Sequence, residues 1–236
     1  MKISVIIPVW NEEKRISSCL DSLLSIMLLK KIYEIIISAD GCTDRTVEIV
    51  QKYSKKYPFI KFVSFTERLG KGGGIINATK IAEGDIYVLT DVDLSVPPEE
   101  FSHFINIYLK TEADLLYGSR YLPNSKFRKK PPMLRILFGR IYNLLFRILF
   151  KSNIRDTQCG FKIIKKEVII TVENEIYIKG FAFDLNLTIQ ALKQGFNIIE
   201  VPIRWEYKEG SKINIIKQPL FMGRDLILLW VKTRFS

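Results

Sequence analysis

The sequence has little cysteine and almost no histidine. Its 236 residues include three cysteines, Cys19, Cys42 and Cys159, with no CxxC pair, and a single histidine, His103. Cysteines spaced this widely exclude a zinc ribbon and a disulfide framework, and they fit a protein of a reducing compartment. A Ser–His–Asp or Cys–His mechanism would depend on His103 alone. No histidine adjoins Cys159, so we do not expect it to be a nucleophile.

Long hydrophobic runs are also missing. Met133–Phe150 is interrupted by three arginines, and Leu220–Val231 is interrupted by Arg224 and Asp225. Neither provides the roughly 20 nearly uncharged residues of a membrane-spanning helix. The apolar run Ile3–Val9 is not followed by the small-residue cleavage site of a signal peptide. We therefore expect neither a spanning helix nor a signal peptide.

Acidic residues are absent from a long central stretch. The net charge is +11 at pH 7, yet residues 1–110 carry equal numbers of acidic and basic side chains, so the whole excess lies in residues 111–236. No acid occurs between Asp114 and Asp156, whereas lysines and arginines occur throughout. A positive charge this local indicates an anionic partner, which is a nucleic acid, a phosphorylated substrate or an anionic membrane.

Apolar runs and helical patterns alternate along the first half of the chain. The expected strands are Lys2–Pro8, Tyr33–Ser38, Phe59–Phe65, Asp85–Thr90 and Asp114–Tyr117. The expected helices are Asn11–Leu29, Asp44–Lys56, Gly73–Ala82 and Pro97–Leu109. This alternation predicts an α/β fold with a mainly parallel central sheet flanked by helices, in which ligands bind beyond the carboxyl ends of the strands. We expect a single domain over residues 1–236.

Two aspartates directly follow the fourth expected strand. Asp91 and Asp93 are two residues apart on a chain leaving a sheet, so their carboxylates point to the same side. Together they can hold a hard divalent cation, and such a cation can bridge a diphosphate. The alternative is a pair of aspartates that only shape a turn.

A glycine-rich segment follows the third expected strand. Residues 68–74 open a helix, so their backbone N–H groups and Lys71 could meet an anion. The segment is neither a Walker A loop nor a complete GxGxxG motif, and a flexible connection is the alternative. In the preceding loop, Asp40 suits contact with a base or ribose, unless turn chemistry alone explains it, and Asp44 fits a helix cap better.

Several short motifs lie at these strand ends and in the second half of the chain. The first half contains Pro8-Val9-Trp10-Asn11-Glu12, Asp40-Gly41-Cys42-Thr43-Asp44, Asp91-Val92-Asp93 and Gly118-Ser119-Arg120. The second half contains Arg155–Lys162, Phe181–Asp184, Trp205, Glu209–Lys212 and Met222–Asp225. Together, over nearly the whole chain, they resemble inverting glycosyltransferases of family 2 with the GT-A fold. The second set resembles the dolichyl-phosphate β-glucosyltransferases in particular.

The resemblance implies a reaction and a donor site. A hexose, glucose in most relatives, would pass with inversion from a UDP-sugar to the phosphate of a polyprenol or dolichol, with Mg²⁺ or Mn²⁺ as the cofactor. Asp91 and Asp93 would hold the metal. Trp10 stands where many relatives carry tyrosine, and Ser95 stands where some mannose synthases offer a further metal ligand. The nucleotide pocket would be lined by Pro8, Trp10, Asn11, Glu12, Asp40, Lys71 and Asp91. Residues 1–118 would form this nucleotide-sugar half, and residues 119–236 the acceptor half.

At the acceptor end, Arg120 and Arg155 would hold the lipid phosphate. A phosphate monoester has a second pKa of about 6 and is a dianion at neutral pH, so it needs cations rather than a general base. A sugar hydroxyl would need a carboxylate base. We expect Asp156 to orient Arg155 or substrate hydroxyls, with the base role as the alternative. The expected catalytic residues are Asp93, Arg120, Asp156 and Gln158.

One helical pattern in the second half combines a basic stripe with a wide apolar face. On a wheel of the expected helix near residues 132–150, one narrow arc holds Arg135, Gly139, Arg140, Asn143 and Arg147. This pattern is typical of a helix in a membrane interface, and the basic segment 126–130 before it could meet anionic headgroups. The alternative is a core helix with exposed arginines. Residues 219–235 are a second candidate, and we expect peripheral attachment to the cytoplasmic face of a membrane.

Four other functions were weighed against this one. A nucleic-acid-binding protein would interleave aromatic residues with its arginines and lysines, whereas leucine and isoleucine dominate here, so we expect no nucleic acid partner. A nucleotidyltransferase would carry its glycine-rich signature in the first strand–helix loop. Transfer to a soluble sugar hydroxyl conflicts with an interfacial helix. A mannose synthase that uses GDP-mannose remains the nearest alternative.

Overall fold

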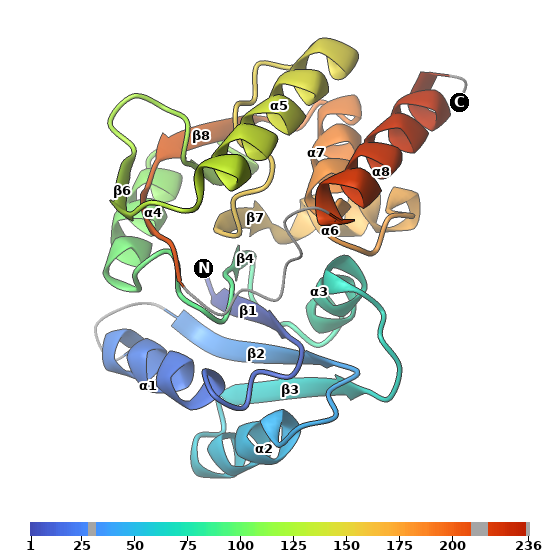
Figure 1. The fold of residues 1–236 in the computed structure, drawn as a ribbon. Helices are drawn as coiled ribbons and strands as arrows, with labels where there is room; N and C mark the ends of the chain where they lie inside the picture. The colour runs from blue at the N-terminus through green and yellow to red at the C-terminus, as the bar shows by residue number, and fades with distance from the viewer. Residues whose placement is uncertain (28–31, 209–216, 235–236) are drawn as a thin grey trace.

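The computed structural model describes residues 1–27, 32–208 and 217–234. Its central element is a seven-stranded sheet (Figure 1). The strand order in this sheet is β3-β2-β1-β4-β7-β5-β8. Its strands are β1 (Ile3–Val9), β2 (Ile32–Asp40), β3 (Ile60–Phe65), β4 (Ile86–Leu89), β5 (Leu115–Ser119), β7 (Lys162–Lys165) and β8 (Ile198–Pro202). A separate parallel pair consists of β6 (Lys126–Lys129) and β9 (Arg204–Glu206).

The sheet is mainly parallel, as the alternation of segments predicted. Only β7 runs against its neighbours, pairing antiparallel with both β4 and β5. The other neighbouring strands of the sheet pair in parallel. The carboxyl ends of β1, β2, β4 and β5 therefore meet at one edge of the sheet, where a ligand site is expected.

Helices cover both faces of the sheet, so successive strand residues are buried on opposite sides. In β1, Val5 and Ile7 belong to one hydrophobic core and Ile6 to the other, as the two-residue period of a strand requires. The first core is closed by α1 (Ile16–Met27), α2 (Thr46–Lys56) and α4 (Glu99–Leu109). The second core is closed by α3 (Lys71–Thr79), α6 (Lys166–Val172) and α7 (Phe183–Lys193). A short 3-10 helix, Glu173–Glu175, follows α6.

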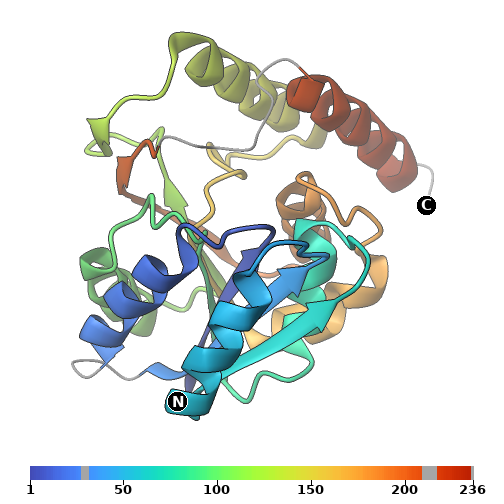
Figure 2. The same cartoon turned by 60° about the horizontal axis from the view of Figure 1, so that its bottom comes forward.

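Two long helices lie side by side at one end of the molecule (Figures 1 and 2). They are α5 (Met133–Phe150) and α8 (Lys217–Arg234), close to the bounds that the sequence predicted. Buried residues on both, such as Phe146 and Leu229, join the second core. Within the ranges that the structure describes, no helix is long and apolar enough to cross a membrane.

The face that α5 turns outward differs from the prediction. The arc that contains Arg135, Asn143 and Arg147 faces the protein: Asn143 is buried, and the two arginines are half-buried. Most of the apolar arc is exposed instead, from Met133 (87%) to Ile148 (64%), whereas Phe146 is buried in the second core. The expectation that the basic stripe faces outward is therefore wrong for Arg135 and Arg147, which face the interior, whereas Arg140 is exposed. The basic segment 126–130 before the helix has regular secondary structure, since Lys126–Lys129 form β6.

Some boundaries shift for local reasons. The first helix begins at Ile16 rather than at Asn11, because Asn11 has a left-handed φ of 54° and hydrogen-bonds to Thr43. The expected end at Leu29 lies outside the described residues. The third helix covers Lys71–Thr79 rather than residues 73–82.

Candidate active site

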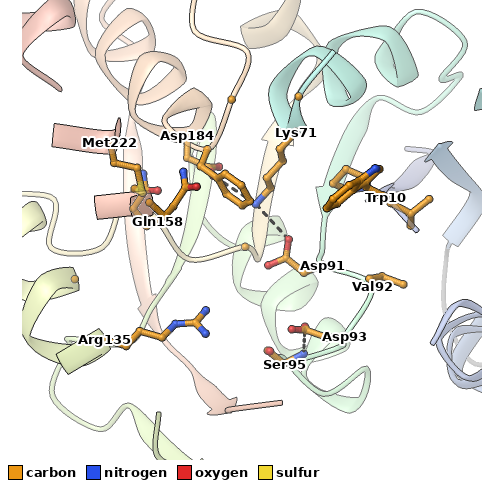
Figure 3. A pocket seen from close by; sticks show the side chains of 18 of the residues that line it. Trp10, Lys71, Asp91, Val92, Asp93, Ser95, Arg135, Gln158, Asp184 and Met222 are labelled. Carbon is orange, nitrogen blue, oxygen red and sulfur yellow. Dashed lines mark hydrogen bonds and ion pairs between the residues drawn. The ribbon is translucent and has the colours of Figure 1, made fainter. Parts of the chain in front are cut away.

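A cavity of about 420 Å³ opens at the carboxyl ends of β1, β2 and β4 and extends to α5 and α8 (Figure 3). Its walls therefore combine loops of the first half with helices of the second half. The expected site residues that line it are Pro8, Trp10, Glu12, Asp40, Lys71, Asp91, Asp93, Arg120 and Gln158. Three other expected residues, Asn11, Arg155 and Asp156, lie outside its lining.

The loop after β1 contains Trp10, Asn11 and Glu12. Trp10 and Glu12 line the cavity. Asn11 Oδ1 accepts a hydrogen bond from the Thr43 backbone N–H at 2.7 Å, so Asn11 joins this loop to the one after β2. Trp10 stacks under the Arg68 guanidinium, 3.8 Å from its carbon to the ring centroid. Trp10 and Arg68 thus line the cavity as a stacked pair of planar groups, on which a planar base can stack.

The glycine-rich loop is not an open anion cradle, contrary to one reading of the sequence. The backbone N–H groups of Leu69 and Gly70 donate to the Asp40 carboxylate at 2.5 and 3.0 Å. Gly72 N–H donates to the Lys179 carbonyl at 2.8 Å. These donors are bound within the protein, so the loop offers a ligand its Lys71 side chain rather than its backbone.

Asp91 and Asp93 face the cavity on the loop after β4. Lys71 Nζ lies 3.2 Å from Asp91 Oδ1, and the Ser95 backbone N–H donates to Asp93 Oδ1 at 2.9 Å (Figure 3). Burial, and then the nearby charge of Asp91, raise the pKa of the Asp93 carboxyl. Negative charge is therefore crowded at this end of the cavity.

That crowding fits a divalent cation. Two carboxylates supply hard oxygen ligands, and diphosphate oxygens can supply more. Among the described residues, no group of three or more His, Cys, Asp or Glu side chains is placed to hold a metal by itself. A metal held by Asp91 and Asp93 would therefore need further oxygen ligands from water or from a bound ligand.

Gly160 packs against the Asp91 carboxylate, and its lack of a side chain leaves room for that group. A methyl group built on Gly160 would overlap the Asp91 carboxylate, so this position accepts only glycine while Asp91 stays where it is. Gly160 ends the Asp156–Gly160 loop that leads into β7, and it lines the cavity. Sequence reasoning recorded this glycine within a motif but assigned it no role.

A chain of alternating charges leads from the cavity into the core, and sequence reasoning missed it. Lys71 lies between Asp91 and Asp184, whose Oδ2 is 3.5 Å from Lys71 Nζ. Asp184 Oδ1 in turn accepts a hydrogen bond from Lys162 Nζ at 2.7 Å. Burial opposes both charges, yet the ammonium groups of Lys162 and Lys71 lower the pKa of Asp184, and Asp184 with Asp91 raises that of Lys71. Lys162 and Asp184 end two of the motifs described in the sequence analysis, Arg155–Lys162 and Phe181–Asp184, and these motifs could have pointed to them.

At the other end, Arg120 forms a two-pronged pair with Asp156. Arg120 Nε and Nη2 donate to the two Asp156 oxygens at 2.8 and 2.9 Å, and the Arg120 backbone N–H also donates to Asp156. Asp156 is fully buried, and its carboxylate pairs with Arg120 rather than with Arg155, one of the two partners expected for it besides substrate hydroxyls. Arg155 is exposed, and its backbone N–H bonds to Glu200. Arg155 thus has no place in the cavity.

Arg135 lines the cavity, although sequence reasoning did not assign it to the site. It extends from α5 into the cavity across from Trp10 and lies over the Tyr207 ring at 5.4 Å (Figure 3). Phe138 and Tyr142 of α5 and Met222 of α8 complete this wall. The helical pattern around Arg135 revealed the helix but not the side that faces the cavity.

Comparison with known proteins agrees with this geometry. Residues 4–172 match the model of glycosyl transferase family 2. Dolichyl-phosphate beta-glucosyltransferases of Dictyostelium discoideum and Drosophila melanogaster are both 30% identical to the chain, over 95% and 98% of it and 72% and 75% of their own lengths. Glycosyltransferase AglD of Haloferax volcanii is 29% identical over 98% of the chain, which spans only 37% of that protein.

Solved structures show the same fold. Glucosyl-3-phosphoglycerate synthase of Mycobacterium tuberculosis in complex with UDP matches 98% of the chain, and 79% of its own chain is covered, with a TM-score of 0.73 at 21% identity. Its complex with Mn²⁺, UDP and phosphoglyceric acid has a TM-score of 0.74. The GT-A architecture expected from the motifs is therefore confirmed. The chain belongs to glycosyl transferase family 2 and is a glycosyltransferase.

Proposed function

We propose that the chain transfers a hexose, glucose in particular, from a UDP-sugar to the phosphate of a polyprenol or dolichol, with inversion. One observation carries this proposal: the same cavity is lined by the Asp91–Asp93 pair, by Arg120 and Arg135, and by α5 and α8, whose outer faces are apolar and exposed. The named relatives that act on dolichyl phosphate support the acceptor class.

The donor binds at the strand ends. The base stacks near Trp10 and Arg68, and the diphosphate lies beside Lys71, Asp91 and Asp93. Asp91 and Asp93 would hold Mg²⁺ or Mn²⁺, which would neutralise charge on the leaving diphosphate. Lys71 adds a cation that Asp184 keeps charged and in place.

The acceptor phosphate binds at the opposite end, held by Arg120 and Arg135. Its oxygen attacks the anomeric carbon from the side away from the diphosphate. The new C–O bond forms as the bond to the diphosphate breaks, and the electron pair leaves with the nucleoside diphosphate. Because the phosphate is already ionised, no general base is needed, and Asp156 serves to fix the Arg120 fork.

The outer faces of α5 and α8 hold the enzyme at a membrane surface. Leu137 and Ile141 on α5, and Phe221 and Ile227 on α8, are exposed and lie on neighbouring helices. Exposed apolar side chains gathered on two neighbouring helices indicate an interaction site, and a lipid acceptor has to be reached from a bilayer. None of the three cysteines, all of which the structure describes, forms a disulfide, in keeping with attachment on the cytoplasmic side.

The test is product identification. Purified protein is incubated with vesicles that contain a polyprenyl phosphate, with UDP-glucose or GDP-mannose, and with Mg²⁺ or Mn²⁺, and the lipid product is identified by mass. We expect glucosyl phosphopolyprenol from UDP-glucose. Product from GDP-mannose alone would change the donor, and glucosylation of a soluble acceptor such as phosphoglycerate, with no lipid product, would overturn the proposal.

A further inference from the structure

Lys162 is a fully buried ammonium that does not line the cavity. It has no exposed side-chain surface and lies in β7, behind the loop that carries Gln158 and Gly160. Its Nζ donates to the Cys159 carbonyl at 2.6 Å and to Asp184 Oδ1 at 2.7 Å. Nζ also lies 4.9 Å from the centroid of the Tyr117 ring. The charge is thus compensated on several sides, as a buried ammonium requires.

Two routes connect Lys162 to the donor end of the cavity. Through Asp184, it holds one carboxylate oxygen, while the other oxygen faces Lys71 at 3.5 Å, and Lys71 faces Asp91 at 3.2 Å. Through the Cys159 carbonyl, it fixes the backbone directly before Gly160, the residue packed against the Asp91 carboxylate. Both routes end at Asp91.

We propose that Lys162 is a positioning residue for the donor diphosphate, acting on Lys71 through Asp184 and on Asp91 through the Cys159–Gly160 backbone. This inference rests on the proposed function, because it assigns the diphosphate to the Lys71–Asp91 end. Partners of this outer kind change metal affinity or activity by about 10–100-fold when they are removed.

The competing explanation is a buried ion pair that only stabilises the packing of β7 on α7. Removing Lys162 alone would leave the buried Asp184 carboxylate with only the longer 3.5 Å contact to Lys71, and the loss of its main partner is destabilising. A second variant therefore removes both charges, so that folding is separated from positioning. In this variant the neutral amide no longer holds the Lys71 ammonium as a carboxylate does.

The experiment measures the Kd of UDP with Mn²⁺ by calorimetry for the wild type, Lys162→Met and Lys162→Met/Asp184→Asn. The KM for polyprenyl phosphate and the melting curve are measured on the same preparations. Lys165→Met is the matched control, since Lys165 lies in the same strand but is 46% exposed and pairs with Asp114 and Glu167, which do not line the cavity. We expect the double variant to melt cooperatively and to bind UDP with Mn²⁺ about 10–100-fold more weakly. The acceptor KM should not change, and Lys165→Met should behave as the wild type.

Three results would count against the inference. Wild-type UDP affinity in the folded double variant would show a packing role only. An equal rise in donor Kd and acceptor KM would show a general loosening of the cavity. A folded wild type that binds neither UDP nor GDP with Mn²⁺ would overturn the proposed function, and this inference with it.

Discussion

Gly160→Ala tests the donor end with one methyl group. The added Cβ would occupy the space of the Asp91 carboxylate, and Gly160 has no left-handed φ that would strain an alanine backbone. Asp91 can move away, since its side chain is 44% exposed, whereas the loop under Gly160 is tied to Lys162. The substitution should therefore displace Asp91 and leave the fold intact.

The size of the effect follows from the overlap. Clearing the new methyl group requires a shift of about 1 Å or more in a group that orients the donor, and a misplacement of this size lowers rates by about 10²-fold. A factor of 10² corresponds to about 2.7 kcal/mol of lost transition-state stabilisation. The melting temperature should stay near that of the wild type.

The assay is kcat/KM for UDP-glucose with a saturating polyprenyl phosphate, alongside a melting curve. Gly180→Ala is the matched control, because Gly180 also lines the cavity but a methyl group there meets nothing within 4 Å. Wild-type activity in Gly160→Ala, or an equal loss in Gly180→Ala, would refute the reasoning.

Three further predictions follow from the same geometry. Lysine cannot reproduce the two-pronged hydrogen bond of Arg120 to Asp156. In Arg120→Lys the KM for polyprenyl phosphate should therefore rise, while the Kd of UDP, measured by calorimetry, should stay unchanged. Loss of UDP binding instead would place Arg120 at the diphosphate. Leu137→Glu/Ile141→Glu should weaken co-sedimentation with vesicles, because both side chains are exposed on the apolar face of α5, and unaltered co-sedimentation would remove the membrane role from this face. Asp93→Asn should lower turnover by at least about 10²-fold. It should also raise the melting temperature at neutral pH in EDTA, since burial and Asp91 raise the pKa of Asp93, and stability is lost as the pH rises through that value. The gain should vanish in acid, where the wild-type carboxyl is protonated, and a constant gain at all pH values would contradict this cause.

The sequence by itself determined five of the seven strands of the sheet and the edge at which Asp91 and Asp93 lie. Buried β-branched runs such as Ile3–Val9 and the helices between them are local patterns, and parallel strands bring their carboxyl ends to one edge. The sequence position of Asp91 and Asp93, directly after the fourth expected strand, therefore assigns them to that edge. The antiparallel strand β7 was missed, because its four residues carry too short a pattern.

Only the tertiary structure decided which charges meet. Arg120 and Asp156 are far apart in the sequence, and their pairing, rather than one with Arg155, depends on β5 lying against the loop before β7. The buried Lys162–Asp184 pair joins β7 to α7 in the same way. No local pattern predicts such pairs, because the free energy of a buried charge depends on the partner that the fold brings to it.

The direction of α5 was also a tertiary decision. A helical wheel separates the arginine stripe from the apolar arc, but it contains no information on which side the rest of the chain covers. The fold uses the polar stripe: Asn143 accepts a hydrogen bond from the Thr157 backbone, and Arg135 enters the cavity. The apolar arc is left outside because polar groups of the site need polar partners, whereas exposed apolar side chains can be covered by a bilayer.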